Sequence, residues 1–364
     1  MTTPQPDTQK TEALVGRLFS SALGALDLLG VYIGDRLGFY KALAMSGPLT
    51  SAQLAKKASV AERYAREWLE QQAVTGFLEV SDATQPSGTR KYSLPPAHAV
   101  ALTEPESPFS IAPMSRFVVA SGKIMPKLLN AYRTGGGVPW SAYGPDAFEA
   151  QGDFNRPWLV NQLGTEYFPA ILDIHARLQA DPPAKVADVC CGVGWAGIAL
   201  ARAYPKITVH GIDLDSKSIT QARKNAAHAG LTKRVKFDMQ NAADPSLKGA
   251  YDLAIVVEAI HDLSKPVEVL KAVRGMLKKN GTAIIVDEKV GDTFKAPSDD
   301  IERLMYGASI LFCLPNGMAE QPSAATGTVM RTSTFRSYAA KAGFKKVEVL
   351  GLEHSFFRFY RLDH

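Results

Sequence analysis

The stretch VADVCCGVGWAG, residues 186–197, carries the strongest fold signal in the chain. A short apolar run over 186–190 leads into a turn in which Gly192, Gly194 and Gly197 recur, and a helical pattern follows over 198–204. A strand, a glycine-rich turn and a helix in this order are typical of α/β domains that bind a ligand against the turn backbone. The back half of the chain is therefore predicted to hold a ligand-binding α/β domain.

Apolar strands and amphipathic helices continue to alternate after this turn. The predicted strands cover residues 186–190, 207–213, 235–239, 251–257 and 282–288. A helix capped by Ser216 follows the second strand, and a helix over 266–278 precedes the fifth. This alternation predicts a parallel sheet with helices on both faces. The last two strands, 344–350 and 356–362, are joined by a short loop, which requires an antiparallel pair.

Two carboxylates beside the glycine turn indicate the kind of ligand. Asp213 ends the second strand, where its carboxylate can accept hydrogen bonds from a ribose diol. Asp188 precedes Gly192 by four residues, and a carboxylate there disfavours a pyrophosphate and favours an ammonium group. The antiparallel C-terminal strand pair and the single unit of five strands also suit a methyl-donor-binding domain better than a dinucleotide-binding domain. These observations favour S-adenosylmethionine over NAD, and an NAD-dependent oxidoreductase stays open as an alternative.

The front third of the chain is predicted to be helical and to end in a hairpin. Apolar residues share one face over 24–44, and Thr50 and Ser59 are predicted to cap two shorter helices. Gly76 is expected to end the second of these, and two strands within 77–94 flank a turn. Helices followed by a hairpin predict a winged helix-turn-helix.

The charge of this module argues against DNA binding. Residues 46–100 carry six basic and five acidic side chains, and the candidate recognition helix interleaves both signs. A net charge of +5 over the whole chain is too small and too scattered to indicate a nucleic-acid partner. The module is therefore predicted to pack or dimerise, with a ligand-sensing transcriptional regulator as the alternative.

Length and composition bound the remaining possibilities. A chain of 364 residues predicts about two domains. Its three cysteines, Cys190, Cys191 and Cys313, form neither a disulfide scaffold nor a zinc-binding spacing, so we expect a cytoplasmic protein without a metal site. No run of ~18 apolar residues and no signal-peptide layout is found, so a membrane span is not expected.

Taken together, these motifs resemble the class I S-adenosylmethionine-dependent methyltransferases, in particular bacterial proteins with a winged-helix domain ahead of the catalytic domain. The segments that carry the resemblance are Asp188–Gly194, Gly211–Asp213, Asn241–Ala242 and Glu258–Asp262. The resemblance implies a Rossmann-like sheet, parallel with a C-terminal antiparallel hairpin, and a homodimer that methylates a small molecule. It also implies three regions: a winged-helix domain over 1–104, a helical linker or lid layer over 105–180, and a catalytic domain over 181–364 with a substrate insertion at about 292–331.

The resemblance implies a role for each matched residue around the cofactor. The implied contacts are Asp188, Cys190, Gly192 and Gly194 for the methionine end, Asp213 for the ribose, Leu214, Asn241 and Ala242 for the adenine, and Glu258 near the methionine amino group. Cys190 stands where the family usually has glycine. A side chain there is expected to require a negative φ.

The acceptor side resembles the His-Asp-Trp motif of plant and bacterial small-molecule O-methyltransferases, in which the histidine is the base. His261 and Asp262 match that motif, and Leu263 replaces the tryptophan. Glu288 matches a carboxylate that orients the base, while Met330 occupies the place of a second one. A histidine that only caps a helix or lines the pocket is the alternative.

The long insertion is predicted to form a mobile apolar lid. It carries Met318, Met330 and a loop rich in Gly, Ser and Thr, and it lies at the ligand-binding edge of the predicted sheet. Tyr143, from the linker layer, is a candidate to line the same pocket. This lining predicts a small aromatic or apolar methyl acceptor, with a hydroxyl as the candidate acceptor group.

Overall fold

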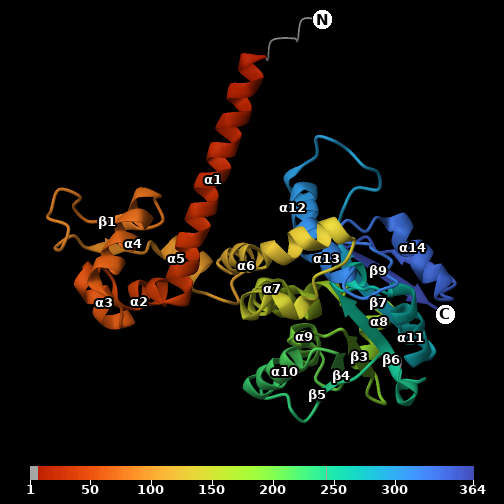
Figure 1. Ribbon diagram of the computed structural model, residues 1–364. Helices are drawn as coiled ribbons and strands as arrows, with labels where there is room; N and C mark the ends of the chain where they lie inside the picture. Colours follow the sequence, from red (N-terminus) through yellow and green to blue (C-terminus); the bar gives the residue numbers. More distant parts are fainter. Residues whose placement is uncertain (1–6, 243) are drawn as a thin grey trace, which may run out of the picture. The chain divides into compact units, whose positions relative to one another are not determined.

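The computed structural model describes residues 7–242 and 244–364, and the chain divides into two compact units (Figure 1). One unit comprises Met1–Gly122 with Glu149–Phe154, and the other comprises Lys123–Phe148 with Asn155–His364. The helical layer expected over 105–180 is thus shared between the two units.

The first unit contains the winged helix. Its elements are α1 (Thr8–Arg36), α2 (Phe39–Ser46), α3 (Ser51–Ala58), α4 (Glu62–Val74), the antiparallel strands β1 (Glu79–Val80) and β2 (Tyr92–Ser93), and α5 (Pro96–Leu102). The aromatic rings of Phe39, Tyr40 and Trp68 form the centre of its core, with the Trp68 ring edge-on to both others. The predicted order of helices and hairpin is confirmed.

Three local predictions for this unit can be compared with the structure. Thr50 accepts a hydrogen bond from the Gln53 amide in a complete capping box, as expected. Ser59 does not cap α4, because it ends α3 in the left-handed region with φ 57°, and Ala61 precedes α4 without a side-chain cap. The apolar run over 24–44 is broken at Gly38, where φ is 69°. That run therefore forms parts of two helices.

Helix α1 is long and apolar enough, by length and composition, to cross a membrane. A membrane span was not expected from the sequence, because it contains no run of ~18 consecutive apolar residues. Large apolar side chains of this helix are exposed in the single chain, among them Leu14, Leu18, Phe19 and Leu26. Length and composition do not distinguish a membrane span from a helix that packs against protein.

The second unit is built on a seven-stranded sheet in the order β5-β4-β3-β6-β7-β9-β8. Its strands are β3 (Lys185–Val189), β4 (Thr208–Asp213), β5 (Val235–Met239), β6 (Tyr251–Val257), β7 (Leu277–Glu288), β8 (Lys346–Val349) and β9 (Phe357–Asp363). Strands β3 to β7 pair in parallel, and β9 pairs antiparallel with both β7 and β8. The predicted parallel sheet with its antiparallel C-terminal hairpin is confirmed.

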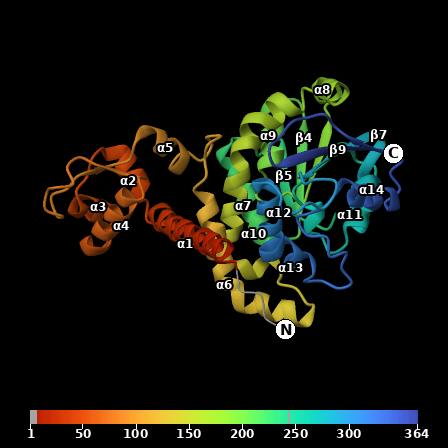
Figure 2. The same cartoon turned by 90° about the horizontal axis from the view of Figure 1, so that it is seen from above.

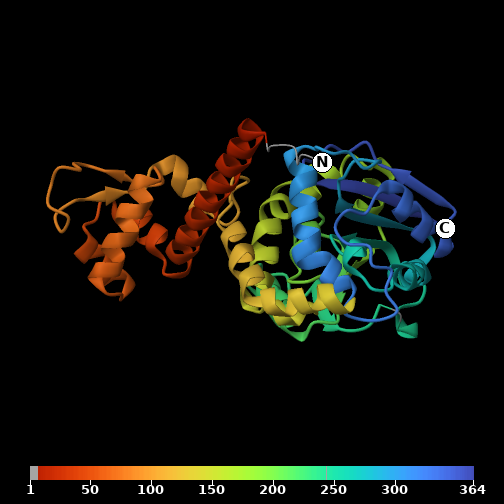
Figure 3. The same ribbon diagram turned by 45° about the horizontal axis from the view of Figure 1, so that its top comes forward.

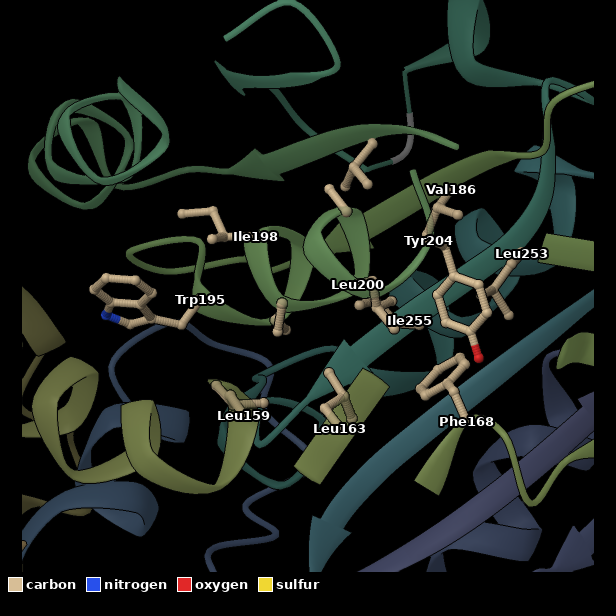
Figure 4. Packing of buried hydrophobic residues seen from close by; sticks show 14 of the residues in the cluster. Leu159, Leu163, Phe168, Val186, Trp195, Ile198, Leu200, Tyr204, Leu253 and Ile255 are labelled. Atoms are coloured by element: carbon tan, nitrogen blue, oxygen red, sulfur yellow. The ribbon is translucent and has the colours of Figure 1, made fainter. Parts of the chain in front are cut away.

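Helices cover both faces of this sheet (Figure 2). The elements on one face are α8 (Leu172–Gln179), α9 (Trp195–Ala203), α10 (Ser216–His228) and the π-helical segment η2 (Leu159–Tyr167). The other face carries α11 (Pro266–Met276) and α14 (Thr332–Lys341). Figure 4 shows Leu163, Ile198 and Ile255 among the side chains of the first layer. Because both faces are buried, the strands read as continuous apolar runs.

One local prediction in this unit is wrong. Asp215, rather than Ser216, caps α10, and its carboxylate accepts a hydrogen bond from the Ser218 amide. Both residue types favour the cap position, so the sequence pattern does not distinguish them.

The strand order places the ligand-binding edge. From β3 the chain passes outward to β4 and β5 and then returns to β6 on the other side of β3. The sheet therefore has its topological switch point between β3 and β6, where ligands of such sheets bind outside the carboxyl ends of the strands.

The insertion between β7 and α14 folds into α12 (Asp300–Ala308), the π-helical turn η5 (Ser309–Cys313) and α13 (Leu314–Gly317). It packs against residues 123–148, which include the end of α6 (Pro113–Thr134), the short helix η1 (Trp140–Tyr143) and the start of α7 (Pro145–Trp158) (Figure 3). The Val138 amide donates to the carbonyl of Pro315 at 2.9 Å. Part of the expected linker layer thus covers the insertion.

Candidate active site

The turn after β3 is held in shape by the carboxylate of Asp213. The amides of Gly192 and Asp215 donate to its two oxygens, each at 2.9 Å. Gly192 has φ 51°, and a Cβ atom added to it would meet no atom within 4 Å. The turn therefore presents an open backbone surface beside a carboxylate, as a ribose-bearing ligand requires.

Gly194 is required for a different reason. Its φ is 82°, and a Cβ atom there would lie 2.4 Å from the ring of Phe237. The ring comes from β5, so this glycine allows the turn to pack closely on the neighbouring strand. Its role is structural at this point of the sheet.

Asp188 is a buried acid, 1% exposed, near the end of β3. The Gly197 amide donates to its Oδ2 at 2.9 Å. Burial raises the pKa of Asp188 to about 7, an effect that the Gly197 amide opposes and the Asp213 charge increases. No basic side chain contributes to this shift among the described residues. A buried carboxylate that has no cation of the protein beside it suits the ammonium group of S-adenosylmethionine. The residues present therefore fit this cofactor.

Two residues at this edge have left-handed backbones that are unusual for side chains. Cys190 has φ 57°, so the expectation of a negative φ was wrong, and the residue adopts the conformation of the glycine it replaces. Glu258, which follows β6, has φ 51°. Each such residue costs about 1–2 kcal/mol. Strain of this kind is concentrated at functional sites.

The residues expected at the adenine lie where β4 and β5 end. The Gln240 amide donates to the Asp213 carbonyl at 3.1 Å, which brings the two strand ends together. Leu214 is 71% exposed, a high value for an apolar side chain. Asn241 and Ala242 come directly after the end of the adjacent strand β5. Their contacts with adenine stay predictions.

His261 is 2% exposed and sits in the short helix η4 (Ile260–Asp262) after β6. Its Nδ1 lies 2.7 Å from Oδ1 of Asp287, at the end of β7. The amides of Ile260 and Glu288 donate to the same carboxylate. The expectation that Glu288 orients His261 was therefore wrong. Asp287 does so, because its carboxylate lies 2.7 Å from Nδ1 and also accepts a hydrogen bond from the Ile260 amide of η4.

The electrostatics of this cluster are set by buried carboxylates. Burial lowers the pKa of His261, but the charges of Asp287 and Asp262 outweigh it and raise that pKa well above its usual value. Burial, together with the nearby charge of Glu258, raises the pKa of Glu288 well above its usual range. Glu288 thus forms part of an acidic lining beside the histidine.

Cys313 joins His261 from the insertion. Its thiol, at the end of η5, lies within hydrogen-bonding reach of His261 and of Asp262. No role was predicted for Cys313 from the sequence, and more than fifty residues separate it from His261. Asp287 was missed although it directly precedes Glu288, and a search of both acids at that strand end would have found it.

The three apolar or aromatic residues proposed to line the acceptor pocket differ in burial and position. Tyr143 is buried beside this cluster and donates to the Leu311 carbonyl at 2.8 Å, and its ring centre lies 5.2 Å from that of Phe312 with the two rings tilted. Met318 ends α13 and is half-buried. Met330 is buried in the core layer with Phe335, so its assignment to a mobile lid was wrong.

Known protein families match both parts of the chain. Residues 180–326 match the family model of a methyltransferase domain, and residues 24–104 match the Rv2258c-like winged HTH domain. Residues 180–326 thus form a methyltransferase domain, and a winged helix-turn-helix domain of the Rv2258c-like family precedes it in the chain.

The individual relatives share low sequence identity with this chain. Malonyl-(acyl-carrier protein) O-methyltransferase from Halalkalibacterium halodurans is 28% identical over 113 residues, covering 30% of this chain and 41% of the relative. Ajmaline N-methyltransferase from Rauvolfia serpentina is 30% identical over 115 residues, covering 30% and 39%. The chain thus spans about two fifths of the length of these curated relatives. Human N-acetylserotonin methyltransferase, solved with S-adenosylmethionine, matches 100% of this chain and 99% of its own with a TM-score of 0.69 at 16% identity, which shows the shared fold.

Proposed function

We propose that this protein transfers the methyl group of S-adenosylmethionine to a hydroxyl of a small aromatic or apolar molecule. The observation that carries the proposal is the His261–Asp287 pair at the carboxyl edge of the sheet, one strand from the glycine turn. Bound S-adenosylmethionine would supply an electrophilic methyl on its sulfonium. The protein must then align the acceptor and remove its proton.

His261 is proposed to remove that proton. Asp287 engages Nδ1, which leaves Nε2 on the side of Asp262 and Cys313. The side chain of Asp262 is 28% exposed, while its Oδ1 atom, 3.5 Å from Nε2, is buried. Nε2 is therefore the atom that receives the acceptor proton, and Asp287 keeps the imidazole in the required tautomer.

The cofactor is proposed to lie along the turn after β3. Asp188 would attract its ammonium group, with Glu258 nearby, and Asp213 would accept from the ribose hydroxyls. Its adenine would lie between Leu214 and the segment of Asn241 and Ala242. The support is the placement of these residues along one edge of the sheet.

The acceptor class is proposed from the aromatic surroundings of the cluster. Tyr143 packs against Phe312, which directly precedes Cys313, and against Trp140 at 5.6 Å. Glu288 and Met318 complete the proposed surroundings. Aromatic side chains favour flat, apolar partners that they can stack on. The curated relatives include both an O- and an N-methyltransferase, and a base beside the acceptor favours the hydroxyl.

The test uses the His261→Ala variant. Formation of S-adenosylhomocysteine is followed with a panel of hydroxylated aromatic compounds, and cofactor affinity is measured by calorimetry. Turnover of the best acceptor is expected to fall about 10²–10⁴-fold, the usual contribution of a general base. The affinity for S-adenosylhomocysteine is expected to stay within twofold of wild type. Undiminished turnover would remove His261 from the mechanism.

We also propose that the protein is a homodimer. The support is the row of exposed apolar side chains on α1, which includes Leu14, Leu18 and Phe19. Contiguous apolar surface of this kind marks an interface. Light scattering after gel filtration is expected to give twice the 39.3 kDa chain mass. Leu18→Asp is expected to shift this mass toward the monomer, whereas Ser20→Asp, an exposed residue on the opposite face of the same helix, is the matched control.

The winged helix is proposed not to serve as a DNA-binding element. Two of the cations on α4 already pair within that helix, Arg63 with Glu67 and Arg66 with Glu62. A salt-dependent shift assay with mixed DNA is expected to show no binding at physiological salt. The three free cysteines support the further proposal of a cytoplasmic location without membrane attachment.

A further inference from the structure

Three different metal-ligand types converge at the acceptor edge of the sheet. An imidazole nitrogen of His261, a carboxylate oxygen of Asp262 and the thiol of Cys313 all lie within 4.8 Å of one another. His261 Nε2 and Asp262 Oδ1 are 3.5 Å apart. Ligand atoms at ~2.0–2.3 Å from a tetrahedral zinc ion are separated by roughly 3.5 Å. The pair of His261 and Asp262 atoms already has this spacing, and the Cys313 thiol lies within 4.8 Å of the other two ligand atoms.

The histidine is arranged as a metal-binding histidine is. Asp287 holds Nδ1 at 2.7 Å and is itself fixed by two backbone amides, so Nε2 points into the cluster. A carboxylate behind a ligating histidine fixes its tautomer and orientation in metal sites. The Oδ1 atom of Asp262 is buried and accepts no hydrogen bond from the described residues. That oxygen has an unused lone pair on the same side.

We propose that His261, Asp262 and Cys313 bind a zinc ion, with a water molecule in the fourth position. Nitrogen, oxygen and sulfur donors in a set of three suit this borderline ion, and an open fourth position is usual where a site is reachable from solvent. On binding, the Cys313 thiol releases its proton to solvent and forms the zinc–sulfur bond, and Nε2 of His261, where it is protonated, releases its proton to solvent before it binds the ion. No electron transfer is involved.

No metal site was expected from the sequence, because the cysteine spacing matches no zinc pattern. The three ligands come from η4 and from η5, which lie far apart along the chain. Packing of the insertion on η4 brings them together, as the hydrogen bond from Ser264 to the Gly317 carbonyl at 2.7 Å shows.

Occupation of this site has a consequence for turnover that rests on the proposed function, whereas zinc binding does not. Zinc uses the Nε2 lone pair that would otherwise accept the acceptor proton. The bound ion is therefore an inhibitor that competes with the acceptor. Removing it with a chelator restores the base.

The test begins with the purified full chain and cobalt as the probe, without cofactor or acceptor. Tetrahedral Co²⁺ with a thiolate ligand gives intense visible bands and near-ultraviolet sulfur-to-cobalt absorption. Both are expected to appear at one equivalent and to be displaced by Zn²⁺. Zinc affinity is then measured by competition with a chromophoric chelator.

Variants assign the ligands. Cys313→Ser is expected to abolish the sulfur-to-cobalt band and weaken zinc binding at least tenfold, and Asp287→Asn is expected to weaken it about 10–100-fold. Cys191→Ser and the surface variant His228→Ala are the matched controls and are expected to leave the spectra unchanged. Near-ultraviolet absorption that survives in Cys313→Ser, or no cobalt absorption in wild type, would overturn the site.

The inhibition is tested separately with any acceptor from the panel that turns over. Zinc is expected to raise the apparent KM for the acceptor and to leave S-adenosylhomocysteine binding unchanged. If zinc binds with the expected spectra but does not inhibit, the metal site stands and the role of Nε2 as the base is refuted.

Discussion

The cofactor turn and the acceptor cluster lie at the same edge of one sheet, yet they are built in different ways. At the turn, backbone amides of Gly192 and Asp215 hold the Asp213 carboxylate, and most of the geometry comes from one short stretch of chain. At the cluster, side chains from η4, β7 and η5 hold one another. Under the proposed function, this comparison predicts that cofactor affinity and proton transfer are carried by separable parts of the molecule.

The sharpest test of this separation is Asp287→Asn. The amide cannot accept from His261 and from both backbone donors as the carboxylate does, so the imidazole loses its orientation. Turnover is expected to fall about 10²–10⁴-fold. Calorimetry is expected to find unchanged affinity for S-adenosylhomocysteine. Asp300→Asn, on the exposed start of α12, is the control, and a parallel loss of cofactor affinity would show that the two parts are coupled.

Glycine substitutions test the backbone side of the comparison. Gly194→Ala adds a Cβ atom 2.4 Å from the Phe237 ring at φ 82°, whereas Gly192→Ala adds one into open space at φ 51°. The first is expected to lower the free energy of unfolding by about 2–4 kcal/mol and the second by about 1–2 kcal/mol. Urea denaturation without cofactor measures both. Equal losses would mean that the ring yields to the added atom.

The pH dependence of cofactor binding tests the role of Asp188. Its pKa in the free protein is about 7, raised by burial, and a bound ammonium group favours the ionised form. Below pH 7 binding must therefore displace a proton, and the affinity for S-adenosylhomocysteine is expected to fall nearly tenfold per pH unit.

Two controls isolate this effect. Methylthioadenosine lacks the ammonium group and is expected to bind with little change between pH 6 and about 8. Asp188→Asn is expected to flatten the profile for S-adenosylhomocysteine. A wild-type profile that is already flat would place the ammonium group elsewhere.

The smallest expected effect concerns the strained residue at the start of the turn. Cys190→Gly removes the cost of a side chain at φ 57°, while Cys190→Ala keeps it. The glycine variant is expected to be more stable than the alanine variant by about 1 kcal/mol, since greater freedom of the unfolded chain offsets part of the gain. Urea denaturation of the two variants gives the difference directly. A more stable alanine variant would show that the backbone rearranges.

Much of the cofactor side was predictable because it is local. One βαβ unit contains the first strand, the glycine turn, Asp188 and Asp213. Glycine is expected in this turn because positive φ and close packing both favour a residue without a side chain. The winged helix was predictable from helix periodicity and turn residues. Two cap predictions were wrong: Ser59 ends α3 instead of capping α4, and Asp215 occupies the cap position that Ser216 also suits.

What the amino-acid order determined by itself was therefore the α/β sheet, the winged helix and the cofactor turn, because alternating apolar patterns, turn residues and the glycine motif can each be recognised within a short segment. Only the tertiary structure decided that Asp287 rather than Glu288 holds His261, and that Cys313 joins them from the insertion. The physical reason is that adjacent strand residues face opposite ways, and that contacts across more than fifty residues depend on how the insertion packs.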